Sequence, residues 1–98
     1  MEIQKALGLA IKEIRLSKQL TQEFFSDVSS RTYMSVLEGG KKSPSVEKIN
    51  DLANAMGIHP LTILTLSYLI VNEGLTLAEL QRKVSDVDMH LKLTHDLH

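Results

Sequence analysis

Apolar residues recur with helical spacing along nearly the whole length of this chain. Apolar side chains follow one another at steps of three and four residues between Ile3 and Ile14, and this spacing gathers them on one face of an α-helix. The same spacing returns in several later segments, and no segment alternates apolar and polar residues with the period of two that marks a strand. The sequence therefore predicts an all-α domain with short loops.

Capping residues divide this pattern into six predicted helices. Thr21, Ser30 and Ser45 are good N-caps, because each side chain can accept a hydrogen bond from a backbone N–H of the first turn. Pro60 favours a first helical position, and a Thr-x-x-Glu capping box begins at Thr76. The predicted helices span residues 3–18, 22–27, 31–38, 46–56, 60–72, and 77 to 91 or 92.

The predicted core is built mainly from aliphatic side chains, since the chain has two phenylalanines, two tyrosines and no tryptophan. We expect Met34 and Leu37 to face inward and at least one of Phe24 and Phe25 to be buried. The predicted buried faces of the first and fourth helices comprise Ile3, Leu7, Ala10, Ile11 and Ile14, and Val46, Ile49, Leu52, Ala53 and Met56.

Length and composition exclude several classes of protein. The chain has 98 residues and a mass of 11.0 kDa, which is enough for one compact domain. The absence of cysteine excludes disulfide scaffolds and cysteine-based zinc or catalytic sites. The start of the chain lacks the features of a signal peptide, and its most apolar window, Leu61 to Val71, is shorter than a bilayer-spanning helix. We therefore expect a cytoplasmic protein with no membrane partner.

The net charge of -1 hides an uneven distribution. Residues 1–50 carry eight basic and six acidic side chains, whereas residues 51–98 carry three basic and six acidic ones. This asymmetry fits a first half that faces an anion and a second half that associates with protein, although chance produces such differences as well.

The second and third predicted helices form the pattern that carries function. They are short, separated by a tight turn and flanked by helices with apolar faces, which is a helix-turn-helix arrangement. In DNA-binding proteins the second helix of such a pair enters the major groove, and its first side chains reach base edges. The first helix lies across the DNA backbone, where its free N–H groups can hold a phosphate.

Over residues 7–64 the sequence strongly resembles the XRE or Cro/CI-type helix-turn-helix family of phage repressors and bacterial regulators. The resemblance implies a five- to six-helix domain of the lambda-repressor type that binds a double-stranded DNA operator. The segments that carry it, in order, are Ile14-Arg15, Leu20-Thr21-Gln22-Glu23, Tyr33-Met34-Ser35, Leu37-Glu38-Gly39-Gly40, Ser43-Pro44-Ser45, Leu52-Ala53 and Met56-Gly57-Ile58.

The resemblance implies two groups of DNA contacts. Arg31 is the strongest candidate for base reading, because a guanidinium can bond guanine O6 and N7 together and discriminate by roughly 1–3 kcal/mol. The loop lysines would supply affinity and salt dependence rather than sequence choice. The residues expected to read bases are Arg31, Thr32, Tyr33 and Ser35, and those expected on phosphates are Thr21, Gln22, Ser30, Lys41, Lys42 and Ser43.

Two further expectations follow from the family pattern. Arg15 and Glu38 match an ion pair that fixes the recognition helix to the first helix, so they are expected to have a structural role. Eight residues separate Gln22 from Arg31, fewer than the family usually has, and Val28-Ser29-Ser30 replaces the usual glycine turn. This departure predicts a shorter second helix or a tighter turn.

No cofactor, metal or catalytic centre is expected. His90, His95 and His98 lie near the C-terminus, but their spacing does not place a clear pair of ligands one helical turn apart, and no carboxylate completes a site. No pattern typical of a nucleophilic, phosphate-binding or metalloprotease site occurs in the sequence. We therefore expect a binding protein, not an enzyme.

The C-terminal part of the chain is predicted to bury apolar surface against another protein. The fifth helix is apolar on most sides, and the sixth has a near-heptad stripe at Leu77, Leu80, Val84, Val87 and Leu91. We divide the chain into a DNA-binding domain, residues 1–72, and an extension, residues 73–98, that contributes to a homodimer. In the alternative, the fifth and sixth helices complete the core of a single chain.

The favoured interpretation is a repressor that binds an inverted repeat as a homodimer. In one alternative the chain is the antitoxin of a toxin–antitoxin pair, and its C-terminal half binds the toxin. In another it is a restriction–modification controller, which can activate as well as repress.

Overall fold

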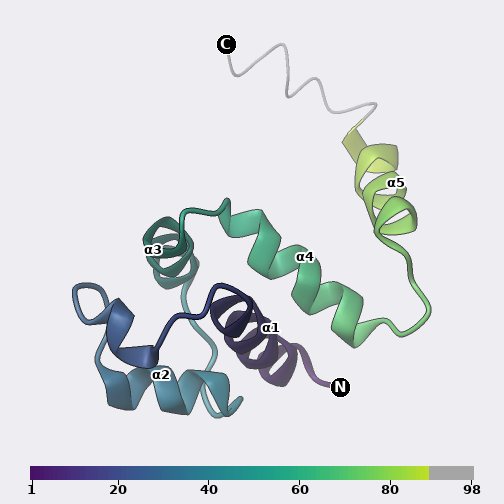
Figure 1. Ribbon diagram of the computed structural model, residues 1–98. Coiled ribbons are helices and arrows are strands. Elements are labelled where there is room, and N and C mark those ends of the chain that lie inside the picture. Colours follow the sequence, from purple (N-terminus) through teal and green to yellow (C-terminus); the bar gives the residue numbers. More distant parts are fainter. Residues whose placement is uncertain (89–98) are drawn as a thin grey trace.

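The computed structural model describes residues 1–88, which form five α-helices and one 3-10 helix and contain no strand (Figure 1). This confirms the all-α prediction. The elements are α1 (Ile3–Ser17), η1 (Gln22–Phe25), α2 (Arg31–Glu38), α3 (Val46–Met56), α4 (Pro60–Val71) and α5 (Leu77–Asp88). The predicted continuation of the last helix to Leu91 or Lys92, like the three C-terminal histidines, lies outside the described residues.

The predicted caps form as expected. The side chains of Thr21, Ser30 and Ser45 accept hydrogen bonds from backbone N–H groups three residues later. Thr76 and Glu79 make the reciprocal bonds of a capping box, with Thr76 N–H donating to Glu79 and Glu79 N–H donating to the Thr76 hydroxyl. Each helix after α1 therefore begins within a residue of the predicted position.

The second helix is shorter than the predicted range 22–27, in the direction that the short spacing between Gln22 and Arg31 predicts. An α-helix through Asp27 is wrong, because the segment is a 3-10 helix of four residues, Gln22–Phe25. The N–H groups of Val28 and Ser29 both donate to the Phe25 carbonyl, so the chain turns immediately after the buried Phe25 ring. The short spacing between Gln22 and Arg31 leaves no room for another turn of α-helix.

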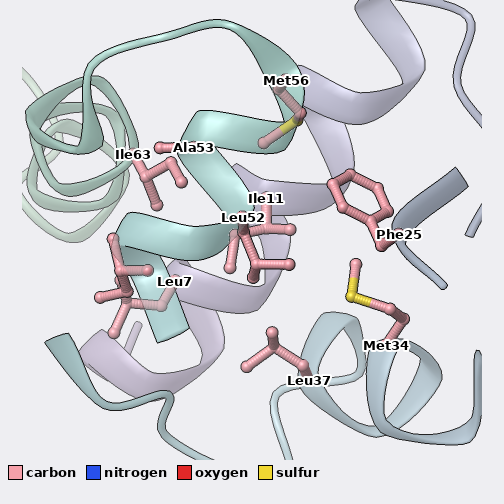
Figure 2. Packing of buried hydrophobic residues seen from close by; sticks show 10 residues of the cluster. Leu7, Ile11, Phe25, Met34, Leu37, Leu52, Ala53, Met56 and Ile63 are labelled. Atoms are coloured by element: carbon pink, nitrogen blue, oxygen red, sulfur yellow. The ribbon is translucent and has the colours of Figure 1, made fainter. Parts of the chain in front are cut away.

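Helix α1 lies at the centre of the molecule, with α2 against one side and α4 along the other (Figure 1), and η1 packs on α2. The core between these helices is aliphatic except for Phe25, and Figure 2 shows Phe25 beside Met34, with Ile11 and Leu52 at the centre. Met34, Leu37 and Phe25 are fully buried, as predicted, whereas Phe24 is exposed. The core residues are Leu7, Ile11, Phe25, Met34, Leu37, Ile49, Leu52, Ala53, Met56 and Ile63.

Two residues assigned to buried faces are exposed. Ile3 is 37% exposed and Val46 is 77% exposed. Each is the first residue of its helix, and helical spacing places it on the apolar face without specifying whether a neighbouring element covers it.

Helices α4 and α5 are less well covered than the rest. Helix α4 packs on α1 through Ile63 and Ser67, while Leu61 and Tyr68 remain exposed. Helix α5 stands apart from the other helices and meets them mainly through α4 (Figure 1). Leu77 and Val84 on α5 are also exposed.

Within residues 1–88, no single helix is long and apolar enough to cross a membrane. Helices α3 and α4 reach that length and composition only together, across a bend of 110°.

Candidate nucleic-acid interface

Helix α2 presents a polar face to solvent because its apolar face is fixed in the core. Met34 and Leu37 are fully buried on the inner side, and the Ser30 hydroxyl caps the first turn by accepting from the Tyr33 N–H at 3.0 Å. Arg31 and Thr32 at the start of the helix are exposed, as is Ser35 one turn later. Three of the four predicted base readers therefore share an open surface; Ser30 lies at its start.

Arg31 is held beside an acidic residue of η1. Its Nη1 lies 3.1 Å from Glu23 Oε1, and the two side chains are 71% and 69% exposed. An ion pair with this exposure contributes little to stability. The guanidinium is therefore available to exchange this partner for another.

Tyr33 differs from the other predicted base readers because it is half-buried and packs against the core. The ammonium group of Lys48, on α3, lies 5.3 Å from the centre of its ring. Lys48 Nζ also donates to the Val28 carbonyl at 2.6 Å. These contacts join the turn before α2 to α3, and only part of the Tyr33 side chain remains open to a ligand.

Gln22 connects the two parts of the predicted interface. Its Oε1 accepts from the Ser35 hydroxyl at 3.0 Å, and its Nε2 donates to Glu38 Oε1 at 3.1 Å. A predicted phosphate contact thus bonds directly to a predicted base reader. Thr21, Gln22 and Arg31 also line one shallow hollow between the end of α1 and η1.

Arg15 and Glu38 form a buried ion pair that joins α1 to the end of α2. Arg15 Nε and Nη2 donate to the two oxygens of Glu38 at 2.7 and 2.9 Å, and Nη1 donates to the Leu20 carbonyl at 2.7 Å. The side chains are 9% and 4% exposed. The hydrogen bond to Glu38 raises the pKa of Arg15 above its ordinary value, against the opposing effect of burial. Among residues 1–88, no buried side-chain nitrogen or oxygen lacks a hydrogen-bond partner, so the bonds of this pair give it a structural character.

The loop after α2 carries two exposed cations, Lys41 and Lys42. Ser43, which was also expected on a phosphate, donates its hydroxyl to Gln4 Oε1 at 3.0 Å instead of leaving it free. Among residues 1–88, no group of three histidine or carboxylate side chains is placed to hold a metal ion.

Comparison with known proteins identifies the same region of the chain. The helix-turn-helix family model matches residues 11–63, which include η1, α2 and the turn between them. The chain belongs to the XRE-type helix-turn-helix family of DNA-binding transcriptional regulators.

Two relatives extend the comparison. Over 67 residues the chain is 34% identical to the uncharacterized HTH-type transcriptional regulator y4dJ of Sinorhizobium fredii, a match that covers 66% of this chain and 87% of the relative. The crystal structure of the clp gene regulator ClgR from Corynebacterium glutamicum superposes with a TM-score of 0.67 at 26% identity, covering 97% of this chain and 96% of that one.

Sequence reasoning missed three residues that position the helix-turn-helix of this regulator. Gly8 on α1 lies against the Leu37 carbonyl so closely that a Cβ would overlap it, which lets the end of α2 approach α1. Lys48 joins α3 to the turn, and Gln4 contacts the loop beyond α2. Gly8 is detectable in principle as a glycine inside a helical pattern, whereas Lys48 and Gln4 act through distant contacts that leave no local signal.

Proposed function

We propose that this regulator is a repressor that binds an inverted-repeat operator as a homodimer, in the cytoplasm, without catalysing a reaction. The observation that carries the proposal is the open face at the start of α2. Arg31, Thr32 and Ser35 are exposed there, with the Lys41–Lys42 loop beyond the end of the same helix. In this proposal the start of α2 reads bases and the flanking groups bind phosphates.

The contacts of Gln22 support a joint role for the two groups of residues. Its amide is already bonded to Ser35. A phosphate bound near Gln22 and a base read near Ser35 would therefore have fixed positions relative to each other. Contacts to phosphate fix the position of a protein on DNA, whereas contacts to base edges select the sequence. Occupation of an operator that overlaps a promoter would exclude the polymerase, which is why we favour repression.

The homodimer is supported by the exposed apolar side chains of the C-terminal helices. Leu61 and Tyr68 on α4 and Leu77 and Val84 on α5 are each 46% exposed or more. A second copy would cover them, and a two-fold dimer would present two recognition helices to half-sites about one DNA turn apart, roughly 34–36 Å. We therefore infer that α4 and α5 provide the dimer contacts.

DNA binding is tested with duplexes from the region upstream of the gene, by fluorescence anisotropy over a range of salt concentrations. We expect the affinity to fall steeply with salt and to be lost in the variant that combines Arg31→Ala with Lys41→Ala. The matched control is Lys12→Ala, which removes an exposed cation of α1 that belongs to neither group of predicted DNA contacts. Affinity that is independent of salt, or unchanged in the double variant, would contradict the proposal.

The dimer is tested by sedimentation equilibrium. We expect the wild type to have twice the chain mass of 11.0 kDa and Leu77→Glu to have the single-chain mass, because a buried unpaired carboxylate opposes association. A wild type that remains a single chain would contradict the homodimer. Stable co-purification of such a single chain with the product of a neighbouring gene would favour the antitoxin function.

A further inference from the structure

The amide of Gln4 bridges the two ends of the Lys41–Lys42 loop. Its Nε2 donates to the Gly40 carbonyl at 2.8 Å, and its Oε1 accepts from the Ser43 hydroxyl at 3.0 Å. Gly40 and Ser43 are the residues directly before and after the two lysines. One side chain in the first turn of α1 therefore holds both ends of a loop that lies nearly forty residues away in the sequence.

The orientation of this amide is fixed by its partners. A carbonyl can only accept a hydrogen bond, so the NH₂ group must face Gly40, and the oxygen is left to accept from the Ser43 hydroxyl. Neither a carboxylate nor an aliphatic side chain of similar size can make both bonds. The half-buried Gln4 side chain thus uses both the donor and the acceptor of its amide on the loop.

The beginning of the loop is fixed by the end of α2 as well. Gly40 N–H donates to the Leu37 carbonyl and Lys41 N–H to the Val36 carbonyl, the paired bonds of a Schellman motif. Gly40 has a φ of +74°, and a Cβ there would lie 2.9 Å from Lys5 Cγ, so the turn lies directly on the first turn of α1. Gln4 adds the second attachment, at the far end of the loop.

We propose that Gln4 is a positioning residue for DNA binding: it holds the loop so that Lys41 and Lys42 meet the phosphate backbone without first having to be ordered. Gln4 does not itself touch DNA. The inference rests on the proposed function of the loop lysines. A loop released from Gln4 would lose more conformational entropy before both lysines reach the phosphates, so one of these contacts would stay unmade. The effect of Gln4 therefore passes through the lysines.

The test measures the affinity of the full chain for a random-sequence duplex as a function of salt. Each lysine–phosphate contact contributes about 0.9 to the slope of log affinity against log salt concentration. We expect Gln4→Leu to lower the affinity roughly threefold to tenfold and to reduce the slope by about one. Ser43→Ala, which removes one of the two bonds, should produce a smaller loss in the same direction.

The decisive comparison repeats Gln4→Leu in a chain that already carries Lys41→Ala and Lys42→Ala. If Gln4 acts through the lysines, Gln4→Leu has no further effect there. An equal loss of affinity in both backgrounds, or an unchanged slope in the wild-type background, would overturn the inference. Circular dichroism checks that the variants fold; if Gln4→Leu does not, Ser43→Ala replaces it in the same comparison, and additivity again overturns the inference.

This experiment separates the inference from the proposed function. Absence of salt-dependent DNA binding by the wild type contradicts the proposed function itself. If removal of the lysines reduces the salt slope but Gln4→Leu has no effect in the wild-type background, only the role of Gln4 is contradicted.

Discussion

The helix-turn-helix region and the C-terminal helices use their side chains in opposite ways. In the first region, polar groups around α2 are paired with one another: Arg15 with Glu38, Gln22 with Ser35 and Glu38, and Ser43 with Gln4. In α4 and α5, large apolar side chains are exposed and α5 contacts little besides α4. The region around α2 thus pairs its polar groups within one chain, whereas the C-terminal helices leave apolar side chains exposed, as the proposed homodimer requires.

The substitution with the largest expected effect removes one partner of the buried ion pair between Arg15 and Glu38. Arg15→Met leaves the Glu38 carboxylate, 4% exposed, without its cation, and loss of one partner of a buried pair costs about 3–5 kcal/mol. Urea unfolding monitored by circular dichroism measures this loss. Arg31→Met is the matched control, because its pair with Glu23 is exposed and should contribute no more than about 1 kcal/mol. Equal losses in the free energy of unfolding from the two substitutions would contradict the expected difference between the buried and the exposed ion pair.

A second prediction compares one leucine from each region. Leu37→Ala removes a fully buried side chain and should lower the free energy of unfolding by about 2–5 kcal/mol. Leu77→Ala removes one that is 47% exposed; at protein concentrations too low for association it should cost less than about 1 kcal/mol. At high concentration Leu77→Ala should instead weaken self-association, measured by sedimentation. A large loss for Leu77→Ala in the dilute chain would show that α5 belongs to the core of the single chain.

A third prediction concerns the junction between α1 and η1. Gln19 has a φ of 59°, in the left-handed region that costs a residue with a Cβ roughly 1–2 kcal/mol. Gln19→Gly relieves this strain but increases the entropy of the unfolded chain, so a net gain of up to about 1 kcal/mol is expected. Thermal unfolding should show a higher Tm, and a lower Tm would contradict the expected relief of strain.

The smallest effect is expected at the start of α5. Hydrogen bonds from the Thr76 backbone and hydroxyl lower the pKa of Glu79. A folded-state pKa below the unfolded one means that the stabilisation is complete above the unfolded pKa and is lost as the pH falls through the folded pKa. Amide hydrogen exchange in α5 should therefore quicken in acid relative to the intrinsic rate. Glu79→Gln, which cannot titrate, should not show that change; the same pH response in this variant would contradict the role of Glu79.

Much of the fold could be predicted because its signals are local. The caps at Thr21, Ser30 and Ser45 and the capping box at Thr76 each depend on residues within one turn, and the structure contains all of them. The inward positions of Met34 and Leu37 followed from helical spacing in the same way. Such patterns specify which face of a helix is apolar, but not how far a neighbour covers it, which is why Ile3 and Val46 were wrongly placed.

The candidate site was less predictable because its contacts join distant segments. The order of the motif identified α2 and its exposed start, but not the bonds that Gln22 makes or the half-buried position of Tyr33. Gln4, Gly8 and Lys48 lie on α1 and α3, and each contributes through a contact with α2 or the segments beside it. Helical periodicity and spacing within one segment carry no information about such pairs.

Selection from a random duplex pool shows whether the start of α2 reads DNA sequence. We expect the wild type to enrich an inverted repeat with half-sites about one helical turn apart. Arg31→Ala should retain the repeat but lose discrimination at one position of each half-site, by roughly 1–3 kcal/mol, whereas Lys41→Ala should weaken binding to all sequences alike. Enrichment of no common sequence by the wild type, or an Arg31→Ala variant that discriminates at every position as the wild type does, would contradict the account.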